Sequence, residues 1–135
     1  MSPPNPLNRP PSGSRSLARN APSIDAYGDG GFRLAGVRHE GSVLILRDEA
    51  ASWPVTEMSG LTLEALQPVF NVGAAEVEFV LLGTGTRNAL PSREIRESLR
   101  QAGIGLEFMD TPTAARIYNL LTSEGRRLAA ALIAV

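Results

Sequence analysis

The sequence predicts a single α/β domain of three layers, in which a mixed β-sheet carries helices on both faces. A chain of 135 residues with 43% apolar composition suits one hydrophobic core. Apolar, strand-like runs alternate with capped helical segments of about ten to fourteen residues, and crossovers of this length join parallel strands. An early pair of strand-like runs is separated only by a turn, which adds an antiparallel part to the sheet.

The first 22 residues differ in composition from the rest of the chain. Residues 1–23 contain six of the ten prolines and three arginines but no acidic residue, whereas residues 24–135 carry ten arginines and fourteen acidic residues. A mitochondrial presequence shares this Arg- and Ser-rich composition, but the prolines would break the amphipathic helix that such a signal needs. We therefore expect a disordered tail over residues 1–22 and one domain over residues 23–135.

Strands and turns are expected in the N-terminal half of the domain. Residues 24–27 are predicted to form a short strand that ends at the glycine cluster 28–31, and alternation over residues 32–40 predicts a longer strand. A turn then leads into the apolar run 42–46, which we expect to be a central strand that forms a hairpin with its predecessor. Residues 48–60 are turn-like in composition.

Capping residues mark three helices in the C-terminal half. Thr62 precedes a short helix, and Ser92 begins a helix that ends at about residue 102. Thr111 and Pro112 begin a longer one, which ends at about residue 124. Apolar runs between and after these helices predict buried strands over residues 77–82, 105–110 and 128–135.

Composition excludes several classes of chemistry. The chain has no cysteine, no lysine and a single histidine, so thiolate metal sites, cysteine nucleophiles, Schiff bases and a P-loop lysine are excluded. The net charge of −1 gives no general attraction to nucleic acid, and no apolar run approaches the ~20 residues needed to cross a bilayer. We expect no catalytic residue, no metal and no cofactor.

The first candidate binding residues are Gly83, Thr84, Gly85 and Thr86, directly after a predicted buried strand. Ligands of α/β sheets bind beyond the carboxyl ends of strands, where the N–H groups of small residues can face an anion. The glycine pattern of dinucleotide-binding loops is incomplete here, because residue 88 is asparagine. The alternative interpretation is a strand-ending turn that needs glycine for its backbone geometry.

Two more candidate positions lie at predicted strand ends. Asp110 and Thr111 would face the same crevice as the first candidate, unless one of them caps the following helix. Gly28 and Arg33 belong to a glycine-rich turn where the guanidinium could hold a carboxylate or phosphate. The alternative there is a wide hairpin with the arginine in solvent.

The helix after Pro112 supplies the remaining candidates, Arg116, Tyr118 and Asn119. Helical spacing places the tyrosine and the asparagine on one face, and we expect Ile117 and Leu121 on the core side. Tyr118 would then lie at the boundary of the core, with its hydroxyl at the edge.

Several stretches of the domain together resemble one family of small proteins. That family contains the mitochondrial respiratory complex I assembly factor three, a vertebrate adipogenesis-associated protein and many uncharacterised bacterial proteins. The resemblance covers about residues 23–135 and is carried by residues 24–33, 41–45, 81–85, 103–111, 114–121 and 124–126.

The resemblance implies three layers around a mixed sheet, and it implies a role in assembly, because the mitochondrial member helps to assemble NADH:ubiquinone oxidoreductase together with a second assembly factor. We therefore expect a non-enzymatic binding or assembly factor, with a complex I subunit or another assembly factor as its protein partner. The alternative is a small-ligand or anion-binding domain that uses the 83–86 turn and the crevice at Asp110 and Thr111. We expect a bacterial protein of the cytoplasm, or a protein of the mitochondrial matrix if the source is eukaryotic.

Overall fold

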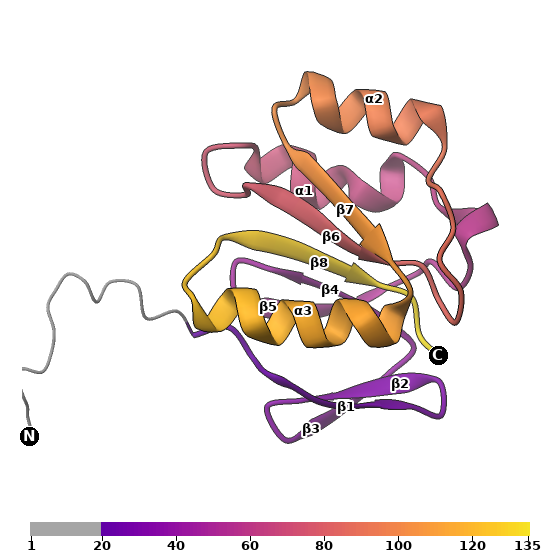
Figure 1. The fold of residues 1–135 in the computed structure, drawn as a ribbon, viewed down its shortest axis with the longest axis vertical. Coiled ribbons are helices and arrows are strands. Elements are labelled where there is room, and N and C mark those ends of the chain that lie inside the picture. Colours follow the sequence, from indigo (N-terminus) through magenta and orange to yellow (C-terminus); the bar gives the residue numbers. More distant parts are fainter. Residues whose placement is uncertain (1–19) are drawn as a thin grey trace, which may run out of the picture.

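The computed structural model describes residues 20–135, which form two β-sheets and three α-helices (Figure 1). The larger sheet has five strands in the order β5-β4-β8-β6-β7, and the smaller sheet has three in the order β1-β2-β3. The strands are β1 (Ile24–Gly28), β2 (Gly31–Leu34), β3 (Val37–Glu40), β4 (Ser42–Leu46), β5 (Glu49–Trp53), β6 (Phe79–Gly83), β7 (Gly105–Met109) and β8 (Leu128–Leu132). The helices are α1 (Gln67–Val72), α2 (Arg93–Gln101) and α3 (Thr111–Ser123), with short 3₁₀ turns at Met58–Gly60 and Glu64–Leu66.

The five-stranded sheet is mixed, as expected. β6 pairs in parallel with both β7 and β8, whereas β4 is antiparallel to both β5 and β8. β8 is the middle strand and is buried along its whole length, which confirms the buried final strand. β4 lies one position from the edge.

Two hydrophobic clusters cover the two faces of this sheet, so the three-layer expectation is confirmed. α1 and α2 pack on one face, while α3 and the small sheet pack on the other (Figure 1). Successive strand residues point to opposite faces. Leu44 and Val80 therefore join the first cluster, and Ile45 and Leu81 join the second.

The single strand and hairpin expected over residues 32–46 are wrong. Ala35 and Gly36 turn the chain with φ angles of 48° and 82°, and this turn splits the stretch into the antiparallel pair β2 and β3. β3 and β4 then belong to different sheets. Gly36 adopts such an angle readily, but alanine seldom does, so the sequence signal for this turn was weak.

A strand, β5, occupies part of the stretch 48–60 that was expected to be turn-like. It follows a tight turn in which Arg47 and Asp48 have φ angles of 54° and 67°. Glu49, Ala50 and Ala51, its first three residues, have low strand propensity, and pairing with the strongly apolar β4 overrides that preference.

The expected tail over residues 1–22 lies almost wholly outside the described residues, and the division into tail and domain stays a prediction. Between residues 20 and 135, no helix has the length and apolar character that crossing a bilayer would require.

Candidate functional site

The 83–86 turn and the stretch at Asp110 and Thr111, both predicted as candidate binding residues, meet at the carboxyl ends of β6 and β7. The Thr84 N–H donates to the Met109 carbonyl at 2.8 Å, and the Thr111 N–H donates to the Gly85 carbonyl at 2.8 Å. The Gly85 N–H donates to the Thr111 hydroxyl at 3.0 Å. These three amides are thus used inside the fold, and an anion at this turn would have to bind to other groups.

Thr111 is the centre of this junction. Its side chain is fully buried, and its hydroxyl donates to the Ile133 carbonyl at 2.7 Å while it accepts from Gly85. Ile133 in turn donates its N–H to the Gly83 carbonyl at 3.0 Å. One threonine therefore connects the loops that follow β6 and β8 to the start of α3.

Asp110 caps α3, as the alternative interpretation proposed. Its Oδ1 accepts from the Thr113 N–H at 2.9 Å, and this hydrogen bond holds the pKa of the Asp110 carboxyl below its usual range. Arg116 is exposed one turn further along the helix and also lowers that pKa through its charge.

Tyr118 and Asn119 fasten the start of β1 to α3. The Tyr118 hydroxyl donates to the Pro22 carbonyl at 2.8 Å. The Asn119 amide accepts from the Ile24 N–H at 2.8 Å and donates to the Ile24 carbonyl at 2.9 Å. Tyr118 is buried in the core, so its expected boundary position is wrong.

Ile117 and Leu121, expected on the core side of α3, are only half-buried. The small residues Ala114 and Ala115 bring the helix close to the sheet, and Tyr118 fills the space beside them. The core stripe is therefore rotated from the one expected.

Gly28 and Arg33 lie in the small sheet, away from the 83–86 turn. The Gly28 carbonyl accepts from Arg38, and the exposed Arg33 donates to the Gly36 carbonyl at 3.3 Å. The turn that contains Gly28 is connected to the other stretches only indirectly, because its Gly30 N–H donates to the carbonyl of residue 135, two positions after Ile133.

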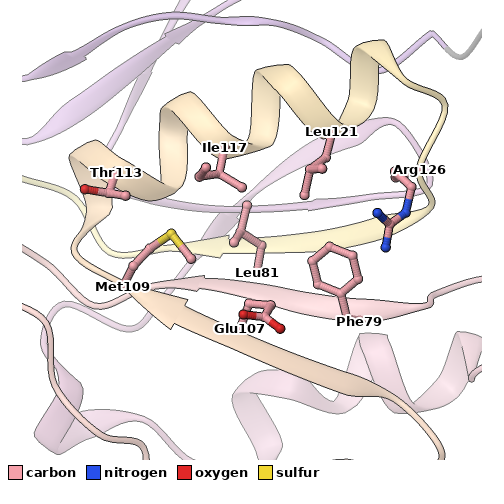
Figure 2. Close-up of a pocket in the computed structure, with 8 residues that line it drawn as sticks. All are labelled: Phe79, Leu81, Glu107, Met109, Thr113, Ile117, Leu121 and Arg126. Atoms are coloured by element: carbon pink, nitrogen blue, oxygen red, sulfur yellow. The ribbon is translucent and has the colours of Figure 1, made fainter.

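A pocket of about 580 Å³ opens between α3 and the strands β6 and β7 (Figure 2). Thr113, Ile117 and Leu121 lie one turn apart on α3, at successive i, i+4 positions, and face the two strands from above. The pocket is lined by Phe79, Leu81, Glu107, Met109, Thr113, Ile117, Leu121 and Arg126.

Apolar groups form the floor of this pocket and charged groups lie at its rim. Leu81 and Phe79 are buried beneath it. Arg126 lies over the Phe79 ring, 5.3 Å from its centroid, and pairs with Glu78 at 3.1 Å. Glu107 is exposed on β7, and no ion pair involves it within residues 20–135. Such a lining suits an apolar side chain that is flanked by polar or charged groups.

Sequence reasoning missed this pocket, although two signals were present. Thr113, Ile117 and Leu121 recur at i, i+4 and i+8, which defines a second apolar ridge on α3. Glu107 lies between Leu106 and Phe108, a pattern typical of an edge strand with one solvated face.

Comparison with known proteins identifies relatives across nearly the whole described region. Residues 24–133 match the family described as "Protein of unknown function (DUF498/DUF598)". An uncharacterized protein of Rhodobacter capsulatus is 39% identical over 110 residues, which are 82% of each chain. Human NADH dehydrogenase [ubiquinone] 1 alpha subcomplex assembly factor 3 is 34% identical over 116 residues, 86% of this chain and 62% of that protein.

A solved structure shares the fold and about a third of the aligned residues. The crystal structure described as an outer membrane protein from Bartonella henselae has a TM-score of 0.79 and 35% identity, and the match covers 85% of this chain and 96% of that one. This chain spans 59–63% of the length of the vertebrate assembly factors that it matches. The matched residues and identities show that the chain belongs to the DUF498/DUF598 family, whose members include the complex I assembly factor 3 proteins and uncharacterised bacterial proteins.

Proposed function

We propose that this chain is a non-enzymatic binding factor that helps a multi-subunit complex to assemble. The assembly-factor names of its relatives support a role in holding other proteins. The observation that carries the proposal is the pocket beside α3, whose apolar floor and charged rim have the composition of a protein-binding surface. The proposed partner is a subunit of a respiratory complex I or a second assembly factor.

The direct test is capture of partners from the native cell. The full chain, tagged at its C-terminus and expressed at its normal level, is isolated after mild crosslinking, and its partners are identified by mass spectrometry. Enrichment of complex I subunits or of an assembly factor over an unrelated tagged protein is the expected result. Enrichment of no such protein would contradict the proposal.

The proposed compartment is the bacterial cytoplasm, consistent with the Rhodobacter capsulatus relative, with the mitochondrial matrix as the eukaryotic alternative. One similar structure is described as an outer membrane protein, so membrane association needs its own measurement. Fractionation of the native cell, with washes at high salt, separates a cytoplasmic protein from a peripherally or firmly bound one.

A small anionic ligand is the second candidate. A crevice of about 300 Å³ lies beside the 83–86 turn, and Arg87 at its wall could supply a guanidinium. The Thr84 and Gly85 amides donate elsewhere, so affinity would depend on Arg87. A thermal-shift screen with phosphates, nucleotides and carboxylates tests this candidate, since a bound ligand raises the melting temperature. A flat response across the panel would remove its support.

A further inference from the structure

β7 is an edge strand whose outer side is unpaired within the described part of the chain. The Gly105 N–H donates to the Glu78 carbonyl at 2.9 Å, and the Met109 carbonyl accepts from Thr84 at 2.8 Å. In a parallel pair, alternate residues direct both backbone groups to the same neighbour. Residues 105, 107 and 109 therefore face β6, and the N–H and carbonyl groups of Leu106 and Phe108 face the open edge.

The pocket beside α3 continues directly onto this edge. Glu107 and Met109 point from β7 to the α3 side of the sheet and line the pocket, as Figure 2 shows. Leu106 and Phe108 point to the opposite face and pack against the core there. An extended chain alongside β7 would thus place every second side chain next to the pocket.

The charges at the pocket indicate what those side chains should be. Arg126 is held in place by Glu78 and by the Phe79 ring, and the same Glu78 carboxylate also faces Arg127 at 4.0 Å. The Glu107 carboxylate is exposed and, among residues 20–135, has no cation paired with it. Glu107 is therefore the charged group that the open edge offers to a partner, and a positive side chain opposite it would match its charge.

We propose that β7 and the pocket bind an extended segment of a partner protein, which adds to the sheet as a strand next to β7. The segment carries an arginine or lysine opposite Glu107 and, two residues away, an apolar side chain that enters the pocket over Leu81 and Met109. Backbone hydrogen bonds with Leu106 and Phe108 supply much of the affinity, and the two side chains supply specificity. This inference rests on the proposed function and assigns the binding mode of the partner.

A second copy of this chain suits the edge less well. An antiparallel β7–β7 pair with its twofold axis at Glu107 would place two carboxylates directly opposite each other, and like charges in that position destabilise strand pairing. Exposed charge on an edge strand also discourages self-association in general.

The test uses a short blocked peptide in which valine, arginine and valine alternate with threonine (TVTRTVT), titrated into the ¹⁵N-labelled full chain. We expect chemical shift changes centred on Leu106, Phe108 and the pocket, and slower exchange of those two amide hydrogens. The same peptide with glutamate in place of arginine should bind at least about fivefold more weakly. Two further peptides are N-methylated at odd or at even positions. In a peptide that pairs with β7, every second N–H group of the peptide donates to the protein and the others face solvent. Strand pairing therefore requires that only one of the two N-methylated peptides loses binding.

Matched variants locate the charge contact. Glu107→Gln should weaken binding of the arginine peptide about two- to fivefold. The variant should bind the glutamate peptide at least as tightly as the wild type does. Glu49→Gln makes the same change on β5, the other edge strand of the sheet, and should leave the affinity unchanged.

Three results of the peptide titrations would overturn the inference. They are absence of shifts at Leu106 and Phe108 even with millimolar peptide, equal binding of both N-methylated peptides, and equal weakening by the Glu49 and Glu107 variants. Concentration-dependent dimers that protect the same amides, seen by analytical ultracentrifugation, would assign the edge to a second copy instead. If complex I proteins are captured from cells equally by wild type and by Glu107→Lys, the proposed function stands and this binding mode fails.

Discussion

The Thr111 side chain occupies the space that a Cβ on Gly83 would need. Such an atom would lie 2.8 Å from the Thr111 Oγ1 and 3.2 Å from its Cα. The glycine at the end of β6 is therefore required by the close approach of α3, and the first turn of that helix is fixed to the sheet by the same contact.

Gly83→Ala should destabilise the fold. The added methyl group meets backbone and a fully buried side chain, and overpacking of this kind costs about 1–3 kcal/mol. Urea unfolding followed by circular dichroism measures the loss. Gly60→Ala is the control, because nothing lies within 4 Å of its Cβ position, and it should change stability by less than about 0.5 kcal/mol. Equal stability of the two variants would contradict the account of the junction.

Thr111→Val should destabilise the protein by about 1–3 kcal/mol, because the Ile133 carbonyl and the Gly85 N–H would each lose a buried hydrogen-bond partner. Thr111→Ser keeps the hydroxyl and loses only a methyl group, so it should be the more stable of the two in the same unfolding measurement. The reverse order would show that packing of the methyl group, and not the hydroxyl network, holds the junction together.

Asn119→Ala should loosen the attachment of β1 to α3. The Ile24 N–H and carbonyl would both lose their side-chain partner. Hydrogen exchange of the Ile24 amide should accelerate at least about tenfold, while amides of β8 exchange as slowly as in the wild type. Unchanged exchange at Ile24 would mean that packing alone holds this strand.

The free energy of unfolding should decrease as the pH is lowered into the acidic range, in part because of Asp110. Its folded pKa lies below the unfolded value of about 3.9, since the Thr113 N–H donates to the charged form. The contribution of the Asp110 carboxylate to stability is therefore present at pH values above the unfolded pKa. It is lost as the pH falls through the folded pKa. Asp110→Asn still caps the helix but does not titrate, so its unfolding free energy should vary less with pH below about 4. An identical pH profile would contradict this role.

Strands with both faces buried were predictable from the sequence, whereas tight turns were not. The runs around Val43, Val80 and Ala130 are apolar on every residue, and that pattern suits only an interior strand. The turns at Ala35 and Arg47 use residue types that seldom adopt a positive φ. The second residue of each turn, Gly36 or Asp48, adopts such an angle more readily, and the pairing of the flanking strands holds Ala35 and Arg47 in it.

The candidate site was predictable in part. The meeting of the 83–86 turn with Thr111 followed from the shared edge of parallel strands. The internal use of their amides depends on distances that sequence does not encode. Similarly, helical spacing defines adjacent faces on α3, but the position of the helix above the sheet decides that Tyr118 is buried and Ile117 lines a pocket.

The central claim, that this chain binds a protein partner through the pocket beside α3, is tested most directly by quantitative capture with a pair of variants. Ile117→Arg places a cation inside the pocket, and Leu120→Arg places the same residue on the solvent side of α3, where the leucine is 54% exposed. Thermal unfolding first verifies that both variants are folded. We expect Leu120→Arg to recover the same partners as the wild type and Ile117→Arg to recover at most about a tenth as much. Equal recovery by both variants, or no specific partner with any of the three chains, would contradict the claim.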